Sequence, residues 1–129
     1  MTTINFKREI AGTFDHAIER ATKALGAEGF GILTRIDMHS KIKEKTGKDI
    51  IPTVILGACN PNLAYEAYVA NSDVASLLPC NAVIREISPG KISLEFAKPT
   101  GMMLILGDAK LTELAREADT KIERALKNV

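Results

Sequence analysis

Two cysteines are the residues of this 129-residue chain best suited to chemistry. Cys59 stands in GACNP and Cys80 in LLPCN, so an asparagine follows each of them. Asn60 and Pro61 form a good helix start, with Asn as the cap and Pro at the first helical position. The positive end of that helix dipole and its free N–H groups stabilise a thiolate, so we expect Cys59 to act as a thiolate.

This pattern suggests a site built from Cys59, Asn60, Cys80 and Asn81. Cys59 would be its thiolate, Cys80 its second sulfur donor or resolving thiol, and the asparagines its orienting hydrogen-bond groups. A small ligand or a soft metal ion suits such donors. Two sulfurs are too few for a closed zinc site. The alternative is that both cysteines are core residues, since free Cys behaves as a small buried hydrophobe.

Other catalytic signatures are missing from the sequence. It contains no G-x-S-x-G motif, and its only histidines, His16 and His39, are not at a metal-ligand spacing. Asp37 and His39 could form a general-base pair, although such a pair more often caps a helix. The sequence pattern identifies no reaction and no cofactor, so whether the protein is an enzyme stays open.

Hydrophobic periodicity predicts alternating strands and helices. Residues 4–10 alternate in the first strand, which puts Arg8 on one face with Phe6 and Ile10. Residues 53–58 are apolar at nearly every position, which is typical of a central strand covered on both faces. The predicted strands cover residues 4–10, 30–36, 53–58, 82–87 and 92–97. The predicted helices begin at Thr13, at Asp37 or Ser40, at Asn60 and at Asp108, with a short helical turn over 74–78.

The clearest local signal is a hairpin. Pro89 and Gly90 suit the two central positions of a type II turn between the last two predicted strands. Pairing across that turn predicts an apolar face made of Val83, Ile87, Ile92, Leu94 and Phe96. Glu86, Ser93 and Glu95 then fall on the other face.

The order of elements is β-α-β-(α)-β-(α)-β-β-α. The hairpin and the long terminal helix favour an α+β fold of two layers, an antiparallel sheet packed by helices, over a parallel α/β sheet. In the antiparallel case, Cys59 and Cys80 lie at the same end of neighbouring strands and face one another. In the parallel case they lie roughly 20 Å apart at 3.3 Å per residue.

Length and composition predict a single domain over residues 1–129. The formal net charge of +1 provides no strong field for nucleic acid. The densest basic stretch, lysines 41, 43, 45 and 48, has no interleaved aromatic and is interpreted as a solvated helix face.

The longest apolar run, Met102–Leu106, is too short to span a membrane. With no apolar signal peptide and few cysteines, we expect a soluble cytoplasmic protein.

The segments GFGILTRID, ILGACNPNLA and LLPCNAVIRE resemble the family known as domain of unknown function 302. The resemblance extends from about Phe14 to Leu126 and shows no departure from the family's motif. It implies an antiparallel sheet with a long C-terminal helix, in a β-α-β₄-α arrangement similar to the TATA-box-binding protein fold. That arrangement favours the version in which the two cysteines are close. It implies no activity.

Two functions remain in view. The first is a domain that binds a small ligand or soft metal at the cysteine–asparagine site; a variant of it places an apolar ligand between the sheet and the last helix. The second is a non-enzymatic homo-oligomer, such as a homodimer, that serves as an interaction or accessory module with its cysteines in the core. The run Met102–Leu106 motivates it, because such a run caps the sheet inside the monomer or forms a dimer patch.

Overall fold

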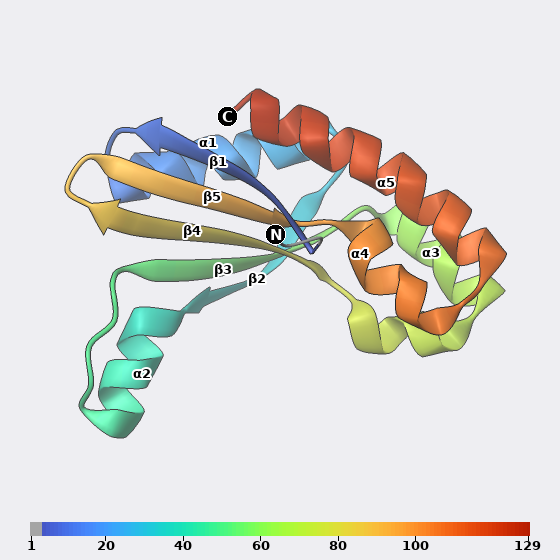
Figure 1. Cartoon of the computed structure of the whole chain (residues 1–129), viewed down its shortest axis with the longest axis horizontal. Helices are drawn as coiled ribbons and strands as arrows, with labels where there is room; N and C mark the ends of the chain where they lie inside the picture. The colour runs from blue at the N-terminus through green and yellow to red at the C-terminus, as the bar shows by residue number, and fades with distance from the viewer. Residues whose placement is uncertain (1–3) are drawn as a thin grey trace.

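The computed structural model describes residues 4–129 (Figure 1). Its elements, with 3₁₀ helices labelled η, follow one another in this order: β1 (Asn5–Ala11), α1 (Phe14–Ala27), β2 (Gly31–Asp37), α2 (Met38–Thr46), β3 (Thr53–Cys59), α3 (Pro61–Ala70), η1 (Ser72–Leu77), β4 (Cys80–Ser88), β5 (Lys91–Ala97), α4 (Pro99–Met103), η2 (Leu104–Leu106) and α5 (Ala109–Lys127). The expected β-α-β₄-α order, with extra short helices between the strands, is confirmed.

Across residues 4–129, five strands form one sheet in the order β1-β5-β4-β3-β2. Every neighbouring pair is antiparallel, which confirms the two-layer α+β prediction and removes the parallel alternative. β3 is an interior strand between β2 and β4, as its apolar sequence predicts. Its coverage on both faces is only partial, because Ile55 stays partly exposed on the side away from the long helices.

The core lies between one face of the sheet and the two long helices, α1 and α5, which also contact each other. Alternation along β3, β4 and β5 directs one apolar side chain in two toward those helices. The two helices place apolar residues on the face that packs against the sheet, at the 3.6-residue helical period. The sheet side consists of Val54, Leu56, Ile84, Ile92, Leu94 and Phe96, and the helix side includes Ile18, Ala21, Leu25, Leu111, Leu114 and Ile122.

Three predicted helix starts are confirmed by side-chain caps. Thr13 Oγ1 accepts a hydrogen bond from the His16 N–H at 3.2 Å. Asp108 Oδ1 accepts from the N–H groups of Lys110 and Leu111 at 2.9 and 3.1 Å. Such contacts satisfy N–H groups that have no partner inside the helix, which explains why each helix begins where it does. The third cap, Asn60, belongs to the site described below.

The predicted hairpin is present, and the predicted apolar face of β5, made of Ile92, Leu94 and Phe96, is confirmed, but the predicted faces of β4 are wrong. Gly90 has φ of 84°, as the third position of a type II turn requires. The register then shifts between Glu86 and Ser88, so the extra residue Ile87 faces no partner. A one-residue shift exchanges the two faces of a strand. The residues of β4 that join the core are therefore Ala82 and Ile84, whereas Val83 lies on the other side and Ile87 is exposed. Glu86 pairs with the core residue Ile92, so its predicted place on the face of Ser93 and Glu95 is wrong as well.

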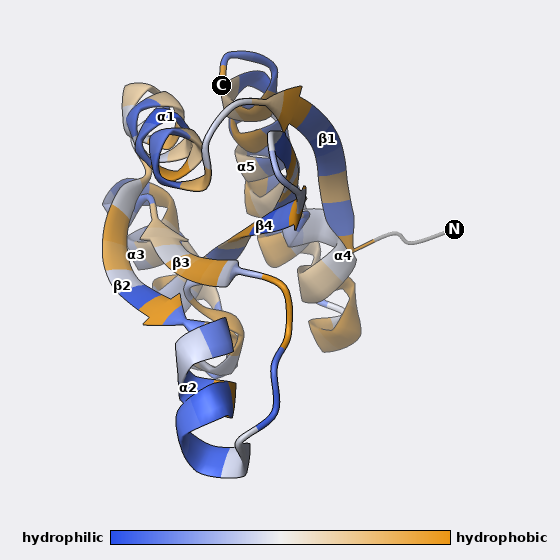
Figure 2. Cartoon of the chain, turned by 90° about the vertical axis from the view of Figure 1, so that its left-hand side faces the viewer, coloured by the Kyte–Doolittle hydropathy of each residue, from blue (hydrophilic) through white to orange (hydrophobic). Residues whose placement is uncertain are grey.

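The connection from β2 to β3 projects from the rest of the molecule. Figure 2 shows α2 extending away from the sheet, with hydrophilic residues along most of its length. No residue of α2 is buried. The interpretation of its lysines as a solvated helix face is thus confirmed.

Candidate functional site

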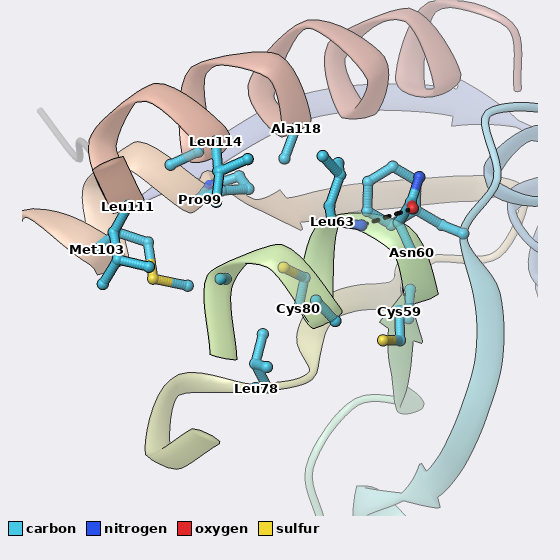
Figure 3. Close-up of a pocket in the computed structure, with 15 residues that line it drawn as sticks. Cys59, Asn60, Leu63, Leu78, Cys80, Pro99, Met103, Leu111, Leu114 and Ala118 are labelled. Carbon is cyan, nitrogen blue, oxygen red and sulfur yellow. Dashed lines mark hydrogen bonds between the residues drawn. The ribbon is translucent and has the colours of Figure 1, made fainter. Parts of the chain in front are cut away.

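The antiparallel pairing of β3 with β4 brings Cys59 and Cys80 to the same end of the sheet, as expected. Their exact positions differ, because Cys80 pairs with Ala58 and Cys59 pairs with Gly31. Residues one register position apart point to opposite faces of a sheet. The prediction that the two cysteines face one another is therefore wrong. Both cysteines nevertheless border one cavity, into which the sulfur of Cys80 is directed (Figure 3).

Burial favours the neutral thiol over the thiolate at both cysteines. Burial raises the pKa of Cys59 above its ordinary value. Burial, with smaller contributions from the negative charges of Cys59 and Asp119, raises the pKa of Cys80 to about 11. Burial thus opposes the thiolate expected at Cys59, which stays a prediction. Desolvation disfavours the charged form, and the cap residue Asn60 already accepts a hydrogen bond from α3.

The two asparagines do not complete a four-residue site. Asn60 Oδ1 accepts a hydrogen bond from the Leu63 N–H at 3.3 Å, the cap predicted for this helix. Its Nδ2 packs over Gly29, where an added Cβ would lie 3.0 Å away. Asn60 therefore ties the start of α3 to the start of β2. Asn81 is exposed and pairs with Gly57, so its side chain does not reach the cavity.

The cavity itself has a volume of about 50 Å³. It lies where the end of β3 and the start of β4 meet α3, α4 and α5 (Figure 3). Its walls are apolar apart from Asn60 and the two cysteines. The residues that border it are Phe30, Ala58, Cys59, Asn60, Leu63, Ala64, Ala67, Leu78, Cys80, Pro99, Met103, Leu111, Leu114, Ala115 and Ala118.

Most of the cavity wall comes from residues that the cysteine pattern did not single out. Leu111, Leu114 and Ala118 belong to the apolar stripe of the last helix, which periodicity detects as core without distinguishing a filled space from a cavity. Pro99 and Met103 come from α4, a helix of five residues that has no periodic signal. The cavity is thus bordered mainly by apolar residues of the sheet and of α3, α4 and α5.

α4 is held in place by a contact from α5. Its cap residue, Lys98, makes no side-chain capping bond. Asp119 supplies the missing acceptor, since its Oδ1 accepts from the Thr100 N–H at 3.0 Å and its Oδ2 from the Thr100 hydroxyl at 2.6 Å. The same carboxylate contributes to the raised pKa of Cys80.

The Asp37–His39 pair is not a general-base arrangement. Asp37 accepts a hydrogen bond from Arg35 at 3.0 Å and makes no capping bond to α2. His39 Nδ1 accepts from the Thr53 N–H at 2.9 Å, and its ring packs edge-on against Phe14. His39 therefore joins α2 to the start of β3.

The part of the chain that the structure describes contains no ready-made cluster of metal ligands. No group of three or more His, Cys, Asp or Glu side chains between residues 4 and 129 is placed to hold a metal ion. Nor does any helix of that region have the length and apolar character needed to cross a membrane.

The fold and the cavity define a class: a two-layer α+β protein whose antiparallel sheet meets three helices around a small apolar pocket. The chain belongs to the family described as domain of unknown function DUF302, whose sequence profile matches residues 6–129. It is similar to the uncharacterized conserved protein DUF302 from Bacillus stearothermophilus, known from a crystal structure. That likeness covers 98% of each chain, with 29% sequence identity and a TM-score of 0.90. No curated protein matches the chain.

Proposed function

We propose that this protein binds a small apolar molecule, or the apolar end of a larger one, in the cavity beside Cys80. The observation that carries this proposal is the cavity itself, whose walls are apolar side chains from the sheet and three helices. Ligand sites are typically concave and mostly apolar, with a few polar groups that orient the ligand. Cys80 would be such a group, as a neutral and polarizable thiol.

The size of the cavity limits what fits inside. An apolar cavity of about 150 Å³ holds a benzene molecule, and one water needs about 10–15 Å³ of probe-occupied space. The volume here, about 50 Å³, therefore suits a group of a few heavy atoms such as a short alkyl end. A larger ligand would keep the rest of its structure outside.

A soft metal ion suits the arrangement less well than an apolar group. Burial raises the pKa of Cys80 to about 11, so a metal that binds its sulfur has to displace a tightly held proton. Met103 adds a thioether sulfur, a soft ligand, but the apolar side chains around it supply no further ligands. Under this proposal Cys59 and Asn60 support the wall, and Asn81 has no part in binding.

The test compares the wild-type protein with a variant whose cavity is filled. Ala118→Leu adds a larger side chain at a position that lines the cavity, and Ala109→Leu makes the same change at an exposed position of the same helix. Xenon, followed by NMR shifts of methyl groups, is the probe. We expect saturable shifts around Met103 and Leu114 in the wild type and in Ala109→Leu, and none in Ala118→Leu. Absence of shifts in the wild type would overturn the proposal.

Native mass spectrometry of protein purified under reducing conditions, without chelator, then asks what the cavity holds. Extra mass that disappears in Ala118→Leu and persists in Ala109→Leu assigns the bound molecule to the cavity. Extra mass that disappears instead in Cys59→Ser, with Ala118→Leu unaffected, would contradict the apolar site and favour chemistry at the sulfur of Cys59.

A second candidate function is a homo-oligomeric interaction module. The side chains of Leu104 and Ile105 favour it, because they are 65% and 80% exposed. An apolar pair of this kind on a surface is typical of a contact between proteins. Under this candidate, sedimentation velocity shows a concentration-dependent mass for the wild type that Ile105→Glu reduces to that of a monomer. A wild type that stays monomeric would contradict it.

A further inference from the structure

Exposed large apolar side chains gather on two surfaces of the molecule. The first surface, the basic arm, comprises residues 35–51 with the neighbouring ends of β2 and β4; its exposed apolar residues are Leu33, Ile36, Ile50, Ile51 and Ile87. The second, the α3 end, comprises residues 61–70 and 104–113; its exposed apolar residues are Tyr65, Tyr68, Val69, Leu104 and Ile105. Figure 1 places α2 and α3 at opposite ends of the long axis.

The basic arm carries more positive than negative side chains. Its cations are Arg35 and lysines 41, 43, 45 and 48, against Asp37, Glu44 and Asp49. Arg35 pairs with Asp37, Lys41 with Glu44 and Lys43 with Asp49. Within residues 4–129, Lys45 and Lys48 make no ion pair. The arm therefore presents uncompensated positive charge together with its exposed apolar residues.

The α3 end has a net negative charge and contains a shallow hollow. Its acidic residues are Glu66, Asp108 and Glu113, against Lys110 alone. Tyr65, Glu66, Val69, Ala70 and Lys110 line a shallow hollow of about 340 Å³. Lys110 is drawn toward Glu113, 4.0 Å away. The hollow is mostly apolar, with one acid and one base in its wall, and it lies on a surface of net negative charge that suits an apolar side chain flanked by lysines.

We infer that the basic arm of one copy of this protein docks on the α3 end of a second copy, in a head-to-tail contact. This inference rests on the second candidate function and names its two surfaces. Charge decides between the possible pairings of copies. Two arms would bring positive against positive and two α3 ends negative against negative, whereas arm against α3 end is complementary. Such a contact uses different patches on the two copies and leaves one of each free to bind further copies.

The experiment uses two variants that each break one surface. Lys45→Glu with Lys48→Glu reverses the arm, and Glu66→Lys with Glu113→Lys reverses the α3 end; all four side chains are exposed, so circular dichroism should confirm a native fold. Sedimentation velocity at rising protein concentration is the readout. We expect the wild type to associate, each variant alone to associate at least tenfold more weakly, and association to weaken in ~1 M salt, where the Debye length is about 3 Å.

Mixing the two variants is the decisive step. The intact α3 end of the arm variant fits the intact arm of the other, and their two reversed surfaces are complementary as well, so an equimolar mixture should form heterodimers that associate further, as the wild type does. The quadruple variant, with both charges reversed, should associate again. Association of the wild type that only the arm variant weakens, with no heterodimer in the mixture, would overturn the head-to-tail contact while leaving self-association in place. A wild type that stays monomeric would contradict both the head-to-tail contact and the second candidate function.

Discussion

The carboxylate of Asp119 on α5 accepts both the N–H and the hydroxyl of Thr100 on α4, at 3.0 and 2.6 Å. A residue 19 positions later in the chain thus performs the capping that Lys98 lacks. Because α4 contributes Pro99 and Met103 to the cavity, this pair of hydrogen bonds sets the position of one cavity wall. It also brings a negative charge near Cys80.

Replacing Asp119 with Asn should loosen that wall. The amide keeps one acceptor oxygen and replaces the other with a donor, so one of the two hydrogen bonds from Thr100 is lost. Because a hydrogen bond to a charged group contributes about 1.5–3 kcal/mol, we expect the free energy of unfolding to fall by roughly that amount. Urea denaturation measures it, with Glu117→Gln on the exposed side of α5 as the control. Equal losses in the two variants would contradict a special role for Asp119.

Cys80 should make the stability of the protein depend on pH in the alkaline range. An unfolded cysteine has a pKa of about 8.5, and the folded state raises that of Cys80 to about 11. The folded protein therefore holds a proton that the unfolded chain releases. This contribution to stability is complete below about pH 8.5 and is lost as pH rises toward 11, at about 1.4 kcal/mol per pH unit.

The measurement compares urea unfolding of the wild type and Cys80→Ala from about pH 8 to about pH 11, a range that spans the ordinary and the raised pKa of the thiol. Other groups titrate in this range in both proteins, so the difference between the two curves isolates Cys80. Alkylation rates in Cys59→Ser and Cys80→Ser give a second readout, in which the thiol of Cys59 should react faster than that of Cys80. Parallel stability curves, or equal alkylation rates, would show that Cys80 keeps an ordinary pKa.

Local signals were enough to predict much of the fold. The caps at Thr13, Asn60 and Asp108 depend on contacts within three residues, and the turn at Pro89-Gly90 depends on backbone conformations that those residues prefer. The antiparallel sheet followed from the hairpin and the family resemblance. Each of these predictions uses information that is contiguous in the chain.

The site was less predictable, because its geometry depends on register and on distant contacts. Proximity of Cys59 to Cys80 followed from topology, but a single register position decides which face each sulfur takes. The bulge near Ile87 changed the hairpin faces for the same reason. The contact of Thr100 with Asp119 joins two helices whose individual patterns contain no sign of it.

Arg8 should stabilise the fold through the end of the last helix. Its predicted place on the apolar face of β1 is explained by its reach, since Nη1 donates to the carbonyl oxygens of Leu126 and Lys127 at 2.8 and 2.9 Å. A cation there also opposes the negative end of the helix dipole. Arg8→Met should lower the free energy of unfolding by about 1–3 kcal/mol in urea. Arg116→Met, the same change at an exposed position of α5, is the control, and an equal loss there would argue against helix capping.

Truncation of Met103 should destabilise the fold far more than truncation of Ile105, although both residues belong to the run Met102–Leu106. Met103 is 6% exposed and lines the cavity, whereas Ile105 is 80% exposed, so the run is part core and part surface. Met103→Ala should reduce the free energy of unfolding by about 2–5 kcal/mol, because it enlarges a cavity in the core. Ile105→Ala should change it by less than about 0.5 kcal/mol in the dilute monomer.

Thermal melts at two protein concentrations measure both effects and separate them. A concentration-dependent loss in Ile105→Ala alone would mark that residue as part of an interface, and a small effect of Met103→Ala would show that α4 does not close the cavity wall.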